Sequence, residues 1–362
     1  MIFIIPLSKK LHHLSMNFNE LQQFFLHFNY NPFFINYQVK FSHYFLCIFT
    51  KISPVFSLST SVIYFHFPIE IKKMLWYNSI IVSETIYKHI KVVILMLHAG
   101  VSTACLYPKP VEEALYDLAL GGVTHTEIFI NTHSELRPDF VGNMAELMRR
   151  FEMTCRSLHF YTCELETLIL FSDYPRRTAD YLEYCRHYFS AMQTLGATVF
   201  VLHESRIPTA SVNRQIYFER YTKLAELGDR YGICVALENV ARCTSGSLEF
   251  LMDMKKALKT RAKFVLDLKQ AVRAGENPMQ MLKMLGENIV HIHLSDHGEY
   301  DDCLPIGKGR FPLSDFLKQL ETYHTDCSVI LELYRSGFRD LSELIQNYHL
   351  LEKRIQSAET TT

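Results

Sequence analysis

The chain has 362 residues and a formal net charge of −1 at pH 7, and 48% of its residues are hydrophobic. This length suffices for one large domain or two small ones, and no basic excess marks nucleic acid as a partner. The nine cysteines are irregularly spaced, and none belongs to a Cys-x-x-Cys motif. This pattern is typical of a reduced, cytoplasmic chain and excludes a disulfide framework or a zinc finger.

Residues 1–95 differ in composition from the rest of the chain. They contain no Gly, Ala, Arg or Asp, yet they hold 13 of the 26 Phe. Their 8 Lys and 3 Glu give a charge of +5, whereas the 29 basic and 35 acidic residues that follow give −6. A folded domain of this length uses Gly in its turns and Ala in its helices. We therefore hypothesise that 1–95 is a non-native or disordered extension, translated from upstream sequence, and that Met96 is the natural start.

The same segment contains no convincing targeting or membrane signal. "MIFIIPLSKK" places its apolar part before its basic residues, which reverses the order of a signal peptide. The best candidate span, 52–69, holds two prolines, four serines, a threonine and a histidine. A membrane helix needs about 20 apolar residues, so we expect no membrane association.

After Met96, short apolar runs alternate with longer amphipathic stretches. The predicted strands are 97–103, 123–130, 152–160, 197–204, 233–239, 263–268, 288–296 and 327–334. Predicted helices over 111–122, 177–196 and 213–232 each end on Gly, as helices often do. This α/β alternation predicts a (β/α)8 TIM barrel over 96–356, followed by a tail, 357–362. An open doubly wound sheet is the alternative, but no glycine-rich dinucleotide loop follows the first strand.

Polar residues follow the apolar runs at the ends of six predicted strands. They are His159, His203, Glu238, Asp267, His293 with Asp296, and Glu332. Because catalytic groups of such barrels stand at the carboxyl ends of the strands, we expect these side chains to share one mouth. A single one is more simply a core histidine, a rim charge or, for Asp267, a helix N-cap. Several such polar residues on successive strands are harder to explain in these ways, because buried charges need partners or a metal.

Four of these residues form a predicted ligand set. Glu238, Asp267, His293 and Glu332 supply three carboxylates and one imidazole. Such donors suit one divalent metal, Mn2+, Mg2+, Co2+ or Zn2+, and leave positions open for water or substrate. A metal there could polarise a carbonyl and stabilise an enediolate, while the two glutamates move protons as catalytic residues.

Five motifs carry a resemblance to a known family. They occur in the order "VALENV" with Glu238, "VLDL" with Asp267, "HIHLSD" with His293, "LPIGKGRF" (304–311) and "VILELY" with Glu332. From Met96 to Gln356 the chain resembles the sugar phosphate isomerase/epimerase superfamily of xylose isomerase-like TIM barrels, to which endonuclease IV is related. The resemblance implies that these four residues bind one divalent metal. It also implies that Glu238 and Glu332 exchange the substrate proton on opposite faces.

The resemblance also decides between two histidines. His291 and His293 lie on the same side of their strand, so alternation cannot separate them. The family's ligand directly precedes Leu-Ser-Asp, which selects His293.

Two positions depart from the family pattern. Many relatives carry His where this chain has Gln270, and Asp-x-His where it has Asp301 and Cys303. Gln can hydrogen-bond a sugar hydroxyl but cannot titrate. His159 and His203 match histidines of endonuclease IV, so part of a multi-metal site could persist, with Cys303 as a thiolate ligand. The same positions also suit a one-metal isomerase in which His159, His203 and Gln270 bind substrate.

We therefore expect an isomerase or epimerase of a sugar, sugar phosphate or related polyol. Its partner would be a small carbohydrate, without nucleic acid, and relatives often form homo-oligomers. The alternative is an endonuclease IV-like metal-dependent phosphodiesterase, and a binding barrel without chemistry is third. Near the predicted mouth, Glu127 could face substrate or support the site. The basic residues there could hold a phosphate or carboxylate, or be solvated rim charges; they are Arg206, Lys308, Arg310 and Arg335.

Overall fold

The computed structural model describes residues 64–65, 93–94, 96–160, 169–172, 174–203, 213–323 and 326–361. The chain divides into two units, Met1–Phe65 with Ile69–Val93, and His66–Pro68 with Ile94–Thr362. Before the barrel, the described residues form β1 (Tyr64–Phe65) and β2 (Val93–Ile94), which pair in a two-stranded sheet. The hypothesis about residues 1–95 thus falls almost wholly outside the described residues. No helix within the described ranges is both long and apolar enough to span a membrane.

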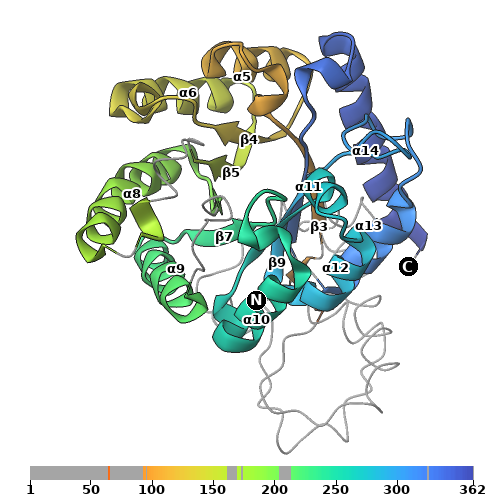
Figure 1. Ribbon diagram of the computed structural model, residues 1–362. Helices are drawn as coiled ribbons and strands as arrows, with labels where there is room; N and C mark the ends of the chain where they lie inside the picture. Colours follow the sequence, from red (N-terminus) through yellow and green to blue (C-terminus); the bar gives the residue numbers. More distant parts are fainter. Residues whose placement is uncertain are drawn as a thin grey trace, which may run out of the picture. The chain divides into compact units, whose positions relative to one another are not determined.

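Eight parallel strands of the second unit close into a barrel, which confirms the predicted TIM barrel (Figure 1). The strands are β3 (Met96–Ser102), β4 (His125–Phe129), β5 (Thr154–His159), β6 (Val199–Leu202), β7 (Cys234–Glu238), β8 (Phe264–Asp267), β9 (Ile289–Leu294) and β10 (Asp326–Leu331). They pair in chain order, and β10 closes the ring by pairing with β3. Each predicted strand corresponds to one of these eight.

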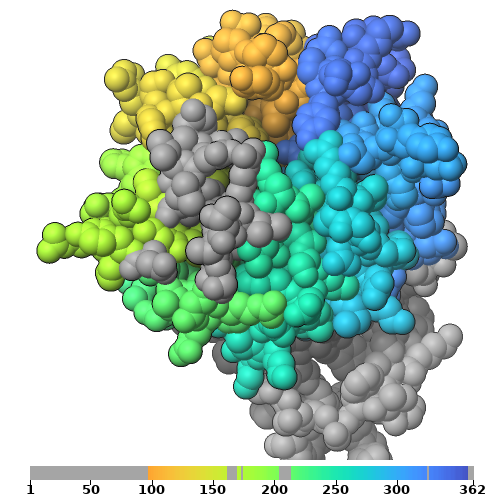
Figure 2. All heavy atoms as spheres, in the orientation of Figure 1, coloured from red at the N-terminus to blue at the C-terminus, as the bar shows by residue number. Residues whose placement is uncertain are grey.

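Helices surround the strands (Figure 1). They are α5 (Val111–Leu120), α6 (Pro138–Arg150), α8 (Pro175–Leu195), α9 (Arg214–Asp229), α10 (Leu248–Leu258), α11 (Leu268–Arg273), α12 (Pro278–Leu285), α13 (Leu313–Tyr323) and α14 (Leu341–Thr361). Short 3-10 turns cover Thr103–Leu106, His133–Leu136, Thr244–Gly246, Lys259–Arg261, Gly286–Asn288 and Arg335–Gly337. Figure 2 shows the outer elements following one another around one face in chain order, from orange to blue.

Aromatic packing shows how a helix is fixed to its strand. Tyr188 and Phe189 of α8 are fully buried, and their ring centroids lie 5.5 and 5.3 Å from that of Phe200 on β6. Such pairs contribute about 0.5–1.5 kcal/mol each beyond the burial of their area. The helix then ends at Gly196, whose φ of +76° is a left-handed conformation that glycine adopts without steric cost.

The register of the strands places polar residues at matching heights. Glu127 on β4 lies beside Ser102 on β3 and Ser157 on β5. Asp267 on β8 lies beside His293 on β9. Because all eight strands run in the same direction, their carboxyl ends meet at one mouth of the barrel.

A charged cluster lies at the opposite, amino-terminal end of the strands. Asp326 of β10 pairs with Arg156 and, at 2.9 Å, with Nε2 of His98. The ring of His98 lies 4.8 Å from that of His125. Burial, and then the nearby His98 and Arg156, lower the pKa of His125 to about 4.

We predict that His125 makes the fold sensitive to mild acid. Its folded pKa lies below its ordinary value of 6.5, so the unfolded chain binds more protons between these values. Stability should therefore be complete above pH 6.5 and fall as the pH approaches 4. The full shift corresponds to about 3 kcal/mol, and solvent screening of this partly exposed side chain reduces the expected loss to about 1–2 kcal/mol. Urea unfolding of His125→Gln should show a smaller loss over this window than the wild type. The matched control His187→Gln, on the exposed face of α8, should behave as the wild type does; an identical pH dependence in all three proteins would contradict the prediction.

Candidate metal centre at the mouth of the barrel

The four predicted ligands lie together. Glu238 and Asp267 are the last residues of β7 and β8, His293 lies near the end of β9, and Glu332 directly follows β10. One ligand atom from each lies within 4.8 Å of the ligand atoms of the other three. Glu238, Asp267 and His293 are buried, whereas Glu332 is partly exposed. The ends of four successive strands thus bring three carboxylates and an imidazole to one point.

A buried nitrogen without a hydrogen bond agrees with a divalent metal at this set of residues. Among the described residues, Nδ1 of His293 is buried without a hydrogen-bond partner. It lies 3.7 Å from Oε1 of Glu238, 3.6 Å from Oδ2 of Asp267 and 3.4 Å from Oε2 of Glu332. Buried polar atoms in native proteins normally have partners. A divalent cation shared with the three carboxylates would provide one, and the donor set suits it.

Asp267 serves as a helix cap and faces the candidate centre at the same time. Its Oδ1 accepts a hydrogen bond from the backbone N–H of Gln270 at 2.9 Å, which caps α11. Its backbone N–H and C=O bind the side-chain amide of Asn239 at 2.7 and 3.0 Å. Oδ2 is left to face His293. The two interpretations of this acid are therefore compatible, because each oxygen has its own role.

Glu127 lies inside the barrel and supports the centre from beneath. This fully buried carboxylate accepts hydrogen bonds from the hydroxyls of Ser157 at 2.8 Å and Ser102 at 3.1 Å. Its Oε2 also lies 3.1 Å from Nε2 of His291 and 3.0 Å from Nε2 of His293. Burial alone would raise the pKa of Glu127, but the two imidazoles hold it well below its usual value. Glu127 thus fixes the His293 ring so that Nδ1 faces the three carboxylates.

The two histidines predicted to bind substrate lie beside Glu238. Nε2 of His203 is 2.5 Å and Nε2 of His159 is 3.4 Å from Oε2 of Glu238, and the two nitrogens are 3.0 Å apart. His159 is buried, whereas His203 is partly exposed. Together with Glu238 they form a second group able to hold a cation; Glu127, His291 and His293 form a third.

Other candidates from the sequence have structural partners. Oε1 of Gln270 accepts a hydrogen bond from the backbone N–H of Ala241 at 3.1 Å, which ties α11 to the segment after β7. Burial raises the pKa of the Cys303 thiol, and Cys303 belongs to none of the three metal-competent groups found among the described residues. The thiolate role considered for Cys303 therefore has no support from the geometry.

The loop 304–311 is held by Asp296 rather than left open for an anion. Oδ2 of Asp296 accepts hydrogen bonds from the backbone N–H groups of Gly307 at 2.9 Å and Gly309 at 3.1 Å. Oδ1 accepts one from Phe311 at 2.9 Å. A carboxylate thus occupies the backbone donors that a phosphate would need. Arg335 donates to the carbonyl of Phe338 at 2.9 Å, and Arg206 lies outside the described residues.

Lys269 is a residue of the centre that the sequence patterns did not single out. It lies on α11 and is only 5% exposed. Its Nζ donates to Oδ2 of Asp267 at 2.5 Å and to Oε2 of Glu332. Burial disfavours its charge, but the carboxylates of Asp267 and Glu332 hold the pKa of Lys269 well above its usual value. The only sequence signal is a lysine two residues after a strand-end acid.

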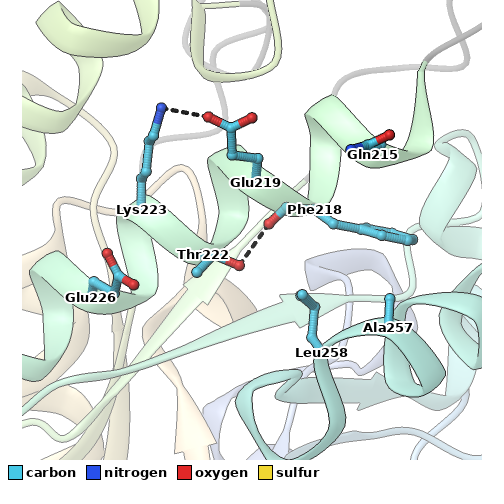
Figure 3. A pocket seen from close by; sticks show the side chains of 8 residues that line it. All are labelled: Gln215, Phe218, Glu219, Thr222, Lys223, Glu226, Ala257 and Leu258. Atoms are coloured by element: carbon cyan, nitrogen blue, oxygen red, sulfur yellow. Dashed lines mark hydrogen bonds and ion pairs between the residues drawn. The ribbon is translucent and has the colours of Figure 1, made fainter.

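A pocket lies elsewhere, between the outer helices α9 and α10 (Figure 3). It measures about 550 Å³, with Phe218, Ala257 and Leu258 among its lining residues. Glu219 and Lys223 form an ion pair of 2.7 Å at this pocket. None of the candidate ligands lines it, so it is separate from the candidate metal centre.

Comparisons with known proteins agree with this architecture. Residues 118–353 match the family model described as xylose isomerase-like TIM barrel. The uncharacterized protein MJ1311 of Methanocaldococcus jannaschii is 25% identical over 271 residues, which cover 70% of this chain and 90% of that protein.

Two solved structures have the same fold. The crystal structure of a D-tagatose 3-epimerase-like protein superposes with a TM-score of 0.59 at 21% identity, covering 72% of this chain and 98% of that one. The structure of the IolI protein with a bound zinc atom gives a TM-score of 0.60 at 17% identity, covering 73% and 99%.

We predict that Glu127→Gln weakens the whole barrel. The glutamine amide cannot accept hydrogen bonds from four donors, and it has no negative charge to offset the imidazoles. The free energy of unfolding should therefore fall by about 2–4 kcal/mol. Urea denaturation measures the loss. Glu146→Gln, which removes a surface acid on α6, is the matched control and should leave the midpoint unchanged. If both variants are as stable as the wild type, Glu127 does not have the supporting role described above.

Proposed function

The chain belongs to the family of xylose isomerase-like TIM barrels, and on this premise we propose that it is a divalent-metal-dependent isomerase or epimerase of a small carbohydrate. The observation that carries the proposal is the convergence of Glu238, Asp267, His293 and Glu332 within 4.8 Å. The similarity to a D-tagatose 3-epimerase-like protein and to the zinc-bound IolI protein supports it.

In this proposal the four residues hold the cation, and the imidazole binds through Nδ1. A bound divalent cation would polarise the substrate carbonyl and stabilise the enediolate that forms when the neighbouring carbon loses its proton. Glu127 keeps the His293 ring in the required orientation, as its 3.0 Å contact with Nε2 indicates.

The protons would be moved by Glu238 and Glu332. In the barrel, β8 and β9 separate β7, which ends in Glu238, from β10, which precedes Glu332. Their carboxylates therefore reach the shared space from different directions. One glutamate could remove the proton from the carbon next to the carbonyl and the other could return it on the opposite face. His203 and His159 beside Glu238, and the side-chain NH2 of Gln270, whose Oε1 accepts from Ala241, are the groups we assign to substrate hydroxyls.

One observation favours a second candidate function, that of a metal-dependent phosphodiesterase. His159, His203 and Glu238 form another group that could hold a cation, as an endonuclease IV-like phosphodiesterase with several metals would require. Against it, Gln270 replaces a histidine of that pattern, and Cys303 is a buried thiol with a raised pKa. We therefore rank the one-metal isomerase first.

We predict that both glutamates are needed for proton exchange. The purified chain with Mn2+ would be screened against ketoses, their phosphates and inososes, and solvent deuterium incorporation next to the carbonyl would be followed by NMR. Glu238→Gln and Glu332→Gln should each reduce the exchange rate at least about 100-fold. Glu299→Gln, an exposed rim acid, is the matched control. Exchange at the wild-type rate in either variant would refute the assigned role.

We also predict the number of metal ions. Native mass spectrometry of the full chain, loaded with Mn2+ and desalted, should find one tightly bound cation per chain. Asp267→Asn should abolish this binding, because it removes a ligand charge from the centre. Three ions per chain would favour the phosphodiesterase over the isomerase.

A further inference from the structure

Lys269 contacts the same oxygen atoms that the proposed metal would need. Its Nζ donates to Oδ2 of Asp267 at 2.5 Å and to Oε2 of Glu332. These are the two oxygens that lie 3.6 and 3.4 Å from Nδ1 of His293. An ammonium and a divalent cation cannot both bind them closely, because like charges at contact distance repel strongly in a buried site.

The ammonium has a clear electrostatic role when no metal is bound. Asp267 and Glu332 lie in the same group as Glu238, so three carboxylates would otherwise repel one another. Buried ionised groups require a compensating charge. Lys269 provides it from α11, a helix that begins directly after Asp267, so the cation and one of its carboxylates are fixed by adjacent backbone.

The surroundings of Lys269 also allow its ammonium to move. Nζ lies 5.8 Å from the centre of the Tyr334 ring, within the range of a cation–π interaction. Four methylene groups connect Nζ to the backbone, so a change of rotamer can take it from the carboxylates toward this ring. The guanidinium of Arg273 also lies over the ring, 5.0 Å from its centre, and its NH1 donates to the Tyr334 hydroxyl at 2.5 Å. Tyr334 is thereby held in place beside the site.

We propose that Lys269 is an internal counter-cation of the metal centre. It holds Asp267 and Glu332 in their ligand positions while the centre is free of metal, and it leaves their oxygens when a divalent cation binds. The cation that enters therefore has to displace a resident positive charge, which weakens its binding. This inference rests on the metal centre of the proposed function and adds a competitor to it.

The test is calorimetric titration of Mn2+ into the EDTA-treated full chain, with thermal unfolding recorded before and after metal is added. Lys269→Met removes the competing charge and should bind Mn2+ at least about tenfold more tightly than the wild type. Without metal, its unfolding temperature should be lower than that of the wild type, and Mn2+ should raise it further. Lys269→Arg keeps the charge and should resemble the wild type in both measurements.

The matched control is Lys255→Met. Lys255 also uses its ammonium in hydrogen bonds, to the carbonyls of Met284 at 2.8 Å and Leu285 at 2.9 Å, but not to the centre's carboxylates. This variant should keep the wild-type affinity for Mn2+. If Lys269→Met folds only when Mn2+ is present, whereas Lys269→Arg folds without it, the counter-cation role is supported as well.

The outcomes separate this inference from the proposed function. If the wild type binds Mn2+ and Lys269→Met binds it no more tightly, the counter-cation role is wrong and the metal-dependent function stands. If Lys269→Met binds Mn2+ but the wild type does not, the role is supported and the metal-dependent function of the natural chain fails. If neither protein binds Mn2+, both are overturned.

Discussion

Three carboxylates, those of Glu238, Asp267 and Glu332, converge at the mouth of the barrel, and this convergence requires positive charge among them. The fold itself causes this convergence, because each acid lies where its strand ends and the closed barrel brings those ends together. Isolated buried charges are unfavourable by several kcal/mol each. The Lys269 ammonium supplies positive charge there, through its ion pairs with Asp267 and Glu332. A divalent cation would supply more positive charge in one atom.

The layer below explains why the imidazole can take part. Glu127 binds Nε2 of His293, and Nε2 of His291 together with the hydroxyls of Ser102 and Ser157 complete the partners of that carboxylate. The ring therefore turns Nδ1 toward the mouth, where it has no hydrogen-bond partner among the described residues. The barrel thus has the fully hydrogen-bonded carboxylate of Glu127 beneath the mouth. Above it lies a centre whose three carboxylates need positive charge. His293 connects Glu127 with this centre. A substitution of Glu127 would therefore alter the centre without removing a direct contact to substrate.

Much of this arrangement could be predicted from the sequence, and particular residues show why the rest could not. Alternating apolar runs predicted all eight strands, and the position of an acid at a strand end predicted the convergence of Asp267 with Glu238 and Glu332. The sequence does not reveal where a long side chain points, so it does not predict the contact of Lys269 with Asp267, although Lys269 follows Asp267 by two residues. Glu127, within "EIFINT", was expected near the mouth of its strand. In the structure the residue lies in the middle of β4, at the level of Ser102 and Ser157. Gln270 departs from the family pattern, and the sequence does not show that its Oε1 accepts a hydrogen bond from the backbone N–H of Ala241.

Anomalous diffraction from crystals of the full chain soaked in Mn2+ tests the central claim most directly. The account predicts one strong peak contacted by Glu238, Asp267, Nδ1 of His293 and Glu332, with the Lys269 ammonium withdrawn from Oδ2 of Asp267. A peak held by His159, His203 and Glu238 alone, or a peak at the four ligands with Lys269 still bound to both carboxylates, would contradict it.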